Sequence, residues 1–164
     1  MPRVIDAREQ RFGGQLEDYE VGDVYKHWPA KTITEAEGNI FCLLTLAAHP
    51  AHIDRTYVEG SAFAQNVVIG TYIYSLLLGM SVPDISGRGL ANLGVSELRH
   101  NAPMYYGDTL FGATEILEVR VSKSRPGAGV LTVRTTGTNQ NDDVVCVFVR
   151  SVLLPSRISE DSSK

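Results

Sequence analysis

The stretch VVIGTYIYSLLLGM, residues 67–80, is apolar at nearly every position. Wound into a helix, its Val, Ile, Tyr, Leu and Met side chains would cover all sides, and a helix that is hydrophobic all round is normally buried. Gly70 and Gly79 interrupt the stretch, and the uncharged run 66–83 around it is shorter than the ~20 apolar residues of a membrane span. These features predict one long helix at the centre of a globular domain.

The residues after this helix have the pattern of β-strands. Apolar and charged side chains alternate over 117–121, which is the period-2 signature of a half-buried strand. Residues 144–154 are apolar on both faces, as expected of a central strand or of a subunit interface. The other candidate strands are 90–98 and 130–136, and turn-forming clusters occur at 125–127 and 139–142.

The residues before the apolar helix predict a short strand and a further helix. Residues 24–28 fit a strand that ends at Pro29. Thr34 and Glu37 have the spacing of a capping box, in which each side chain binds a free amide at the start of a helix. Apolar residues at helical spacing continue to about Leu46, and the helix should end before Pro50, which lacks an amide hydrogen.

Helices followed by a meander of antiparallel strands indicate an α+β domain. A wholly apolar helix is buried only if a sheet curves around it, so the pattern is compatible with a curved antiparallel sheet around one long central helix. We therefore expect residues 15–156 to form one α+β domain. An N-terminal arm, 1–14, would precede it, and a flexible C-terminal tail, 157–164, would follow it.

The composition argues against several classes of function. The chain has 15 Lys and Arg against 19 Asp and Glu, a formal charge of -4, whereas sequence-independent nucleic-acid binding needs clustered basic side chains. The polar N-terminal residues do not resemble a secretory signal. The two cysteines, Cys42 and Cys146, lie in apolar runs, as buried and reduced thiols would. We expect a cytoplasmic protein that binds neither nucleic acid nor membrane.

Four segments follow one another in an order that is more specific than any one of them. They are Leu16–Asp23 (LEDYEVGD), His49–Asp54 (HPAHID), Phe63–Gly70 (FAQNVVIG) and Pro103–Leu110 (PMYYGDTL). Together they resemble the MaoC-like family of (R)-specific enoyl-CoA hydratases and dehydratases. Motifs of this family include Gly-Asp-x-Asn-Pro-Leu-His, Phe-Gly-x-x-Val-x-His-Gly and Pro-Val-x-x-Gly-Asp-Thr-Leu. The resemblance implies the hot-dog fold, in agreement with the pattern of elements.

Two segments are similar to a subgroup of single-domain members of this family. Residues 43–52 read LLTLAAHPAH where the subgroup has Leu-Leu-Thr-Met-Asn-Thr-His-Pro-Leu-His, and residues 124–127 read SRPG, as in the subgroup. The subgroup is associated with hydration of mesaconyl-CoA and itaconyl-CoA, whose acyl groups are short, branched and dicarboxylic. The resemblance therefore implies a lyase that hydrates or dehydrates an acyl-CoA substrate of this kind.

The resemblance carries over one half of the family's catalytic pair, an Asp and a His five residues apart. His52 matches the His, whereas the Asp falls on Ala47. Hydration of an unsaturated thioester needs a base that activates water, an acid that protonates the α-carbon, and donors that stabilise the enolate oxygen. His52 could serve both proton transfers in turn, with help from His49 or Asp54, because an imidazole titrates near neutral pH. Asp54 could instead cap the short helix that follows it.

Ala47 leaves two alternatives to a working hydratase. One is an acyl-CoA-binding module with weak or no hydratase activity, since loss of a general acid or base typically costs about 10²–10⁴ in rate. The other is a thioesterase, because other hot-dog proteins use a carboxylate for thioester hydrolysis. The nearest carboxylates for that reaction are Asp54 and Glu59.

Gly70, Arg125 and Arg99 are the candidates for oxyanion and substrate binding. Gly70 matches the family's glycine at the start of the central helix, where a free amide and the helix dipole favour negative charge. A glycine there could equally serve close packing of helix and sheet. The two arginines could pair with phosphate or carboxylate groups, although each also fits a solvated turn or strand end. His27 and His100 have the sequence context of surface or strand-end residues.

We expect neither a metal nor a bound cofactor, because the sequence has no ligand cluster and no Gly-rich dinucleotide loop. Coenzyme A would enter as part of the substrate. We also expect a homodimer or a higher homo-oligomer, in which two sheets join edge to edge and leave no exposed strand edge. Active sites would then form at the subunit interface.

Overall fold

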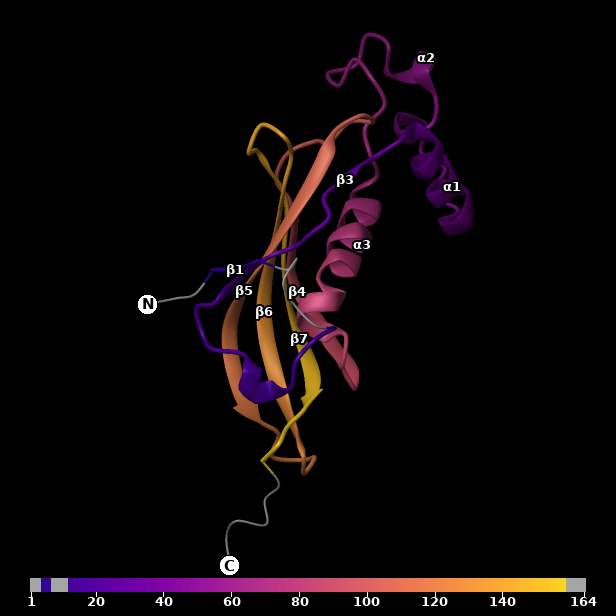
Figure 1. The fold of residues 1–164 in the computed structure, drawn as a ribbon. Helices are drawn as coiled ribbons and strands as arrows, with labels where there is room; N and C mark the ends of the chain where they lie inside the picture. Colours follow the sequence, from indigo (N-terminus) through magenta and orange to yellow (C-terminus); the bar gives the residue numbers. More distant parts are fainter. Residues whose placement is uncertain (1–3, 7–11, 159–164) are drawn as a thin grey trace, which may run out of the picture.

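The computed structural model describes residues 4–6 and 12–158, and its long strands form one sheet with a helix along one face (Figure 1). The elements, with η for short 3-10 and π helices, are β1 (Val4–Asp6), η2 (Leu16–Asp18), β2 (Val24–Lys26), β3 (Lys31–Thr32), α1 (Glu35–Thr45), η3 (Pro50–His52), α2 (Arg55–Val58), α3 (Gly70–Met80), η4 (Val82–Ser86), β4 (Ala91–His100), β5 (Thr109–Val121), β6 (Ala128–Thr138) and β7 (Val144–Pro155). The strand order is β1-β2-β5-β6-β7-β4, with β3 beside β5. All pairs are antiparallel except β1 with β2.

Helix α3 packs closely on the sheet because two glycines leave room for it. Gly112 on β5 and Gly137 on β6 are register partners. A Cβ added at Gly137 would come within 2.6 Å of the Leu77 side chain, and one at Gly112 within 3.2 Å. Leu77 and Ile73 are buried at this contact, where they join a core cluster that includes Phe148. The two glycines therefore set how near the helix lies to the sheet.

The central helix starts later than the sequence predicts. It begins at Gly70, because Ile69 is extended and the two residues before it pair with the segment before β5. Val67 forms a β-bridge with Tyr105, and the Val68 amide donates to the Met104 carbonyl at 2.7 Å. Residues 67–69 thus run alongside the loop before β5 and end where the helix begins.

Burial of α3 is one-sided, and the expectation of a helix buried on all sides is wrong for this chain. A single sheet covers only the side of the helix that carries Ile73 and Leu77. The remaining apolar side chains of the helix are only half-buried, namely Tyr72, Tyr74, Leu76, Leu78 and Met80. The helix therefore keeps an apolar side that this sheet does not cover.

The predicted strands are confirmed, and β5 and β6 extend well beyond their predicted bounds. Strand β7 lies between β6 and β4, so its two apolar faces belong to a central strand. Within the predicted N-terminal arm, residues 4–6 form β1, which the sequence did not predict. The boundaries of the domain at 15 and 156 stay predictions, and residues 159–164 of the tail lie outside the described residues.

The two cysteines are free and buried, as expected. Burial raises the pKa of the Cys146 thiol to about 11 and also raises the pKa of Cys42. Both thiols are therefore protonated at neutral pH and behave as small apolar groups.

The predicted capping box of α1 is confirmed. The Thr34 hydroxyl accepts from the Glu37 amide at 3.4 Å, and the Glu37 carboxylate accepts from the Thr34 amide at 3.0 Å. The apolar residues of this helix nevertheless face outward, with exposed fractions of 77% for Leu43 and 79% for Leu44. Helix α1 lies beyond one end of the sheet, next to α2 and the start of α3 (Figure 1).

Helix α1 is anchored where Gly38 meets Tyr106. Gly38 is buried, and a Cβ there would overlap the Tyr106 ring. The Tyr106 hydroxyl in turn donates to the His52 carbonyl at 3.0 Å. This contact joins α1, the loop before β5 and the segment that carries His52.

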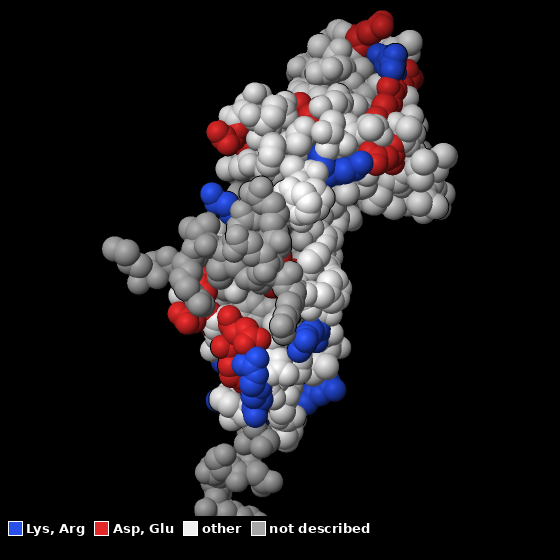
Figure 2. All heavy atoms as spheres, in the orientation of Figure 1, with Lys and Arg blue, Asp and Glu red and all other residues white. Residues whose placement is uncertain are grey.

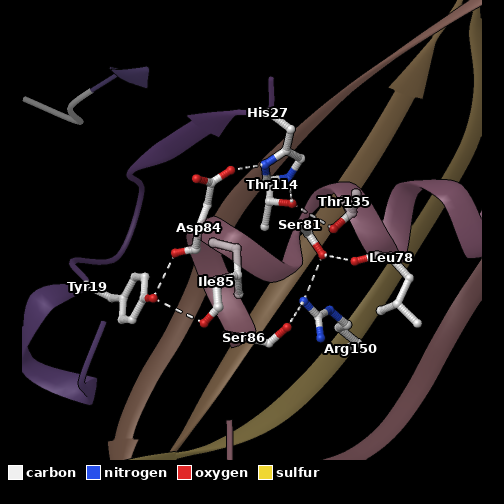
Figure 3. Close-up of polar contacts among 10 residues, drawn as sticks. All are labelled: Tyr19, His27, Leu78, Ser81, Asp84, Ile85, Ser86, Thr114, Thr135 and Arg150. Carbon is white, nitrogen blue, oxygen red and sulfur yellow. Dashed lines mark hydrogen bonds and ion pairs between the residues drawn. The ribbon is translucent and has the colours of Figure 1, made fainter. Parts of the chain in front are cut away.

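A buried polar network lies at the C-terminal end of α3 (Figure 3). His27 Nδ1 is 2.6 Å from the Asp84 carboxylate, and His27 Nε2 is 2.7 Å from the Thr114 hydroxyl. Arg150 donates to the Ser81 hydroxyl at 2.9 Å in the same region. His27 directly follows β2, in agreement with the expected strand end. The surface alternative is wrong, because its ring points into the interior and its side chain is fully buried.

We expect His27→Leu to lower the free energy of unfolding by about 3 kcal/mol, because it leaves the Asp84 carboxylate buried without its partner. Urea denaturation followed by circular dichroism measures the change. Glu118→Gln is the control, since Glu118 and Arg120 form an exposed pair at 3.5 Å and should contribute less than about 0.5 kcal/mol. Equal losses in the two variants would contradict the importance of the buried contact.

We expect Gly38→Ala to destabilise the protein by about 2 kcal/mol, because the added methyl group displaces the Tyr106 ring. Gly79→Ala is the matched helical control, because nothing lies within 4 Å of a Cβ at Gly79. Alanine is the better helix former, so this control should stabilise the protein by about 0.5–1 kcal/mol. Thermal and urea unfolding measure the change in the free energy of unfolding for both variants. Changes of the same sign in the two variants would refute the Gly38 contact.

Candidate functional site

The segment His49–Asp54 is a short turn that neighbouring residues hold in place. The Asn66 side-chain amide donates to the Ala51 carbonyl at 3.1 Å and to the carbonyl of the last residue of the segment at 3.0 Å. The Tyr106 hydroxyl binds the His52 carbonyl from another direction. Burial raises the pKa of Tyr106 to about 12, so its hydroxyl keeps the hydrogen that it donates. The backbone around His52 is therefore fixed before any ligand arrives.

The ring of His52 is oriented by a backbone carbonyl. Its Nδ1 lies 2.9 Å from the carbonyl oxygen of Val67. A carbonyl oxygen only accepts hydrogen bonds, so Nδ1 carries a hydrogen and, in the neutral ring, Nε2 carries a lone pair. The half-buried His52 thus presents a proton acceptor at Nε2.

His49 has the opposite arrangement. Its Nδ1 accepts a hydrogen bond from the Ala51 amide at 3.2 Å, so the neutral ring carries its hydrogen on Nε2. The ring centroids of His49 and His52 are 6.0 Å apart. The turn therefore brings together one imidazole that can accept a proton and one that can donate a hydrogen bond.

Asp54 caps α2. Its Oδ1 accepts from the Thr56 amide at 2.9 Å, from the Thr56 hydroxyl at 2.7 Å and from the Tyr57 amide at 3.3 Å. The hydroxyl of Thr56 and then the amide of Tyr57 lower the pKa of the Asp54 carboxyl. Of the two interpretations of Asp54, the contacts support the helix cap, and its role in catalysis stays a prediction.

Gly70 is the first residue of α3, and its N-cap, Ile69, provides no side-chain acceptor. Within residues 4–6 and 12–158, no hydrogen bond is described that uses the Gly70 amide as donor. A cavity of about 370 Å³ opens beside Gly70, with apolar walls that include Ile73 and Met104. Val67 also borders this cavity, and its carbonyl binds the His52 imidazole.

His100 is a further residue that lines this cavity, and no motif in the sequence predicts it there. It is the last residue of β4, in agreement with the expected strand end. Its imidazole nevertheless lies against Gly70, with ring atoms 2.7–3.0 Å from the position that a Cβ of Gly70 would take. A lone histidine near a strand end has no local signature that could have revealed this contact.

The two candidate arginines lie away from His52 and Gly70 in this chain. Arg99 is opposite Val147 on β7, on the face of the sheet that points away from α3. Arg125 lies in the turn between β5 and β6, where its amide donates to the Ser122 hydroxyl at 3.2 Å. This turn is at the end of the sheet opposite α1 and α2 (Figure 1). Their roles as substrate ligands stay predictions.

The charge on the face shown in Figure 2 is mixed in sign. Acidic and basic side chains lie interspersed on the face shown in Figure 2, and they form no large patch of one sign on its described part. In the described residues, no group of three or more His, Cys, Asp or Glu side chains could hold a metal ion. No helix among them is long and apolar enough to cross a membrane.

The site therefore combines three chemical elements. His52 offers a base with a fixed tautomer, His49 offers an N–H donor nearby, and the start of α3 offers a free amide at the positive end of a helix dipole. The third of these groups borders a largely apolar cavity, where low polarity strengthens the electrostatic effect of the Gly70 amide on a bound carbonyl. This combination suits proton transfer to and from carbon atoms next to a polarised carbonyl group.

Known proteins that are similar to this chain include hydratases and dehydratases of coenzyme A thioesters. The family model described as mesaconyl-CoA hydratase matches residues 2–163. A mesaconyl-CoA hydratase from Cereibacter sphaeroides is 30% identical over 145 residues, which are 88% of this chain and 42% of the relative. The structure of a MaoC domain dehydratase from Chloroflexus aurantiacus superimposes with a TM-score of 0.85 at 27% identity, over 92% of this chain and 42% of that one.

A Mycobacterium tuberculosis protein described as having a double hot-dog fold superimposes with a TM-score of 0.77 at 23% identity, over 93% of this chain and 46% of that chain. This likeness confirms the predicted hot-dog fold. This chain thus spans less than half the length of each of these three proteins. The match over nearly the whole chain shows that it belongs to the mesaconyl-CoA hydratase family of MaoC-like hot-dog proteins.

Proposed function

We propose that this chain hydrates the double bond of an enoyl-CoA thioester, or removes water in the reverse direction, with His52 as the acid and base. The observation that carries the proposal is the bond from His52 Nδ1 to the Val67 carbonyl, which leaves Nε2 free to accept a proton. A short or branched dicarboxylic acyl group, such as mesaconyl or itaconyl, is the proposed substrate. Support for that choice comes from the named relative and from residues 43–52 and 124–127.

In the proposed reaction the thioester carbonyl lies at the Gly70 amide. Nε2 of His52 takes a proton from water while the water oxygen bonds to the β-carbon of the acyl group. The electrons of the carbon–carbon double bond move towards the thioester, and the enolate oxygen is stabilised by the Gly70 N–H and the helix dipole. His52 then returns the proton to the α-carbon, the enolate collapses to the carbonyl, and one water has been added. The Nε2–H of His49 assists as a hydrogen-bond donor.

We propose further that two copies of the chain pair through β4 as a homodimer, which could assemble into a higher homo-oligomer. Every residue of β4 is exposed along the edge of the sheet, and Leu93, Val95 and Leu98 have exposed fractions of 53%, 40% and 41%. An apolar edge strand of this length is a ready template for another strand. The half-covered side of α3 and the outward Leu43 and Leu44 of α1 are further apolar surfaces for a second copy.

The alternative function is an acyl-CoA-binding module without turnover. The observation that favours it is Ala47, which stands where the family has its catalytic Asp. In that case the cavity at Gly70 would bind the thioester, but no group would share the proton transfers with His52. A thioesterase is the weaker alternative, since Asp54 is engaged as a helix cap. The cytoplasmic location stays a prediction.

We expect wild-type protein to consume mesaconyl-, itaconyl- or crotonyl-CoA, measured as loss of absorbance at the enoyl-thioester band. His52→Ala should lower kcat by about 10²–10⁴-fold, because it removes the general base and acid, while the Kd for a saturated acyl-CoA changes little. Glu118→Gln, on an exposed strand, is the control and should retain full turnover.

Other outcomes separate the alternatives. Bound acyl-CoA without turnover would support the binding module, and in that case Ala47→Asp should create hydratase activity. Release of free coenzyme A thiol, detected with a thiol reagent, would support the thioesterase. Turnover that persists in His52→Ala would contradict the proposed role of His52.

We expect Leu93→Lys combined with Leu98→Lys to convert the dimer into a monomer, because two desolvated ammonium groups oppose pairing of the β4 edges. Light scattering coupled to size-exclusion chromatography measures the molar mass. Val21→Lys is the matched control, since Val21 is 63% exposed and lies outside the sheet edge. An unchanged mass in the double variant would exclude β4 as the dimer contact.

A further inference from the structure

An irregularity in β4 turns His100 towards the helix. Ser96 is opposite Val149 and Arg99 is opposite Val147, so three steps along β4 match two along β7. The extra residue is accommodated at Glu97, whose φ of 54° lies in the left-handed region. Simple alternation from Val95 would have put position 99 on the helix side of the sheet and position 100 on the far side. A β-bulge reverses this order and re-aims the side chains that follow it.

The new orientation is defined by the partner of His100 on β7. His100 is opposite Cys146, whose side chain belongs to the core cluster under α3. Directly opposed residues of an antiparallel pair place their side chains on the same face. The imidazole of His100 therefore lies on the helix side of the sheet, at the end where α3 begins.

The face of the His100 ring lies over Gly70. The three ring atoms nearest to the position of a Gly70 Cβ are Cε1 at 2.7 Å, Nε2 at 2.8 Å and Nδ1 at 3.0 Å. Three nearly equal distances place that position above the ring plane, so the ring packs flat on Gly70 and its N–H group lies in the ring plane beside the first residue of α3. Only a glycine can occupy position 70 while the ring stays in this place.

His100 is also the one titratable side chain among the residues that line the cavity. Most of the wall is apolar, and it includes Val68, Ile73 and Met104. Within the described part of the chain, no hydrogen bond involves either nitrogen of the His100 ring. The N–H is thus available to a ligand that enters the cavity beside the Gly70 amide.

We propose that His100 is a second donor for the thioester oxygen, so that its imidazole N–H and the Gly70 amide together hold the oxygen on which the enolate charge develops. This inference rests on the proposed hydratase function and adds a catalytic residue to it. Two donors aimed at one oxygen are the usual construction of an oxyanion hole, and imidazole groups serve in this role. His100 moves no proton in the reaction and acts only through the hydrogen bond.

The test combines turnover with the vibrational spectrum of a bound carbonyl. His100→Phe removes the donor and keeps a flat ring, whereas His100→Gln keeps an N–H donor. We expect His100→Phe to lower kcat by about 10²–10³-fold with little change in KM, for crotonyl-CoA and mesaconyl-CoA alike. His100→Gln should recover part of this loss. Ser96→Ala, on the same strand but on the opposite face, should leave turnover unchanged.

Infrared difference spectra of butyryl-CoA labelled with carbon-13 at the thioester carbonyl give a readout that needs no turnover. Binding to the wild type should move the carbonyl band to lower wavenumber, and this shift should be largely lost in His100→Phe. Circular dichroism and thermal unfolding establish that each variant is folded.

The outcomes separate the two proposals. If the wild type has no turnover but the band shift depends on His100, the hydratase proposal fails and the donor role stands. If turnover and band shift survive in His100→Phe, the donor role is refuted and the hydratase proposal stands. A loss confined to mesaconyl-CoA would also overturn the inference, because it would assign His100 to the distal carboxylate of the substrate and not to the thioester oxygen.

Discussion

The contact of Leu77 with Gly112 and Gly137 is the constraint on which the arrangement of the molecule depends. Without side chains at these two register partners, the sheet has a depression into which the helix side chain fits. Interiors are packed at nearly crystalline density, so a methyl group at Gly137 would push the helix outward. The start of α3 would move with it, and so would the amide of Gly70 relative to β4. Packing at the middle of the helix therefore determines the geometry at its end.

The same packing leaves half of the helix uncovered, and this one-sidedness explains several features together. A sheet that meets only Ile73 and Leu77 cannot cover a helix whose other side also carries leucines. The Cereibacter sphaeroides hydratase and the Chloroflexus aurantiacus dehydratase are more than twice as long, and a structural neighbour is described as having a double hot-dog fold. In such a longer chain, a second hot-dog unit could cover the open side of the helix and the edge strand. Under the proposed pairing, a second copy of this chain would cover the same surfaces. A second copy would therefore bury the side of the helix that this sheet leaves half-covered. Residues 67–80 are apolar on all sides, as expected of a helix that is fully buried only in the assembly.

Local signals in the sequence predicted the parts of the fold that depend on local physics. The capping box at Thr34, the alternation over 117–121 and the two-sided apolar run of β7 each correspond to an observed element. The family motif also located His52 within a turn whose carbonyls and rings are fixed. His100 could not be found in this way, because its position depends on one extra residue in β4 relative to β7. Register between strands is a non-local property, and a one-residue slip exchanges the two faces.

Ala47 stands where the resemblance to MaoC-like hydratases implies an Asp, and under the proposed function this changes which part of the site has to lower the energy barrier. In this chain His52 is oriented by the neutral carbonyl of Val67. A neutral acceptor fixes the tautomer, but it stabilises a protonated imidazole less than a carboxylate would. Base catalysis by His52 would therefore be weaker than in an Asp–His pair, and stabilisation of the enolate would have to contribute more. Under the proposed function, the Gly70 amide, the dipole of α3 and the His100 N–H act together on that oxygen. Stabilisation of the enolate thereby offsets the weaker base.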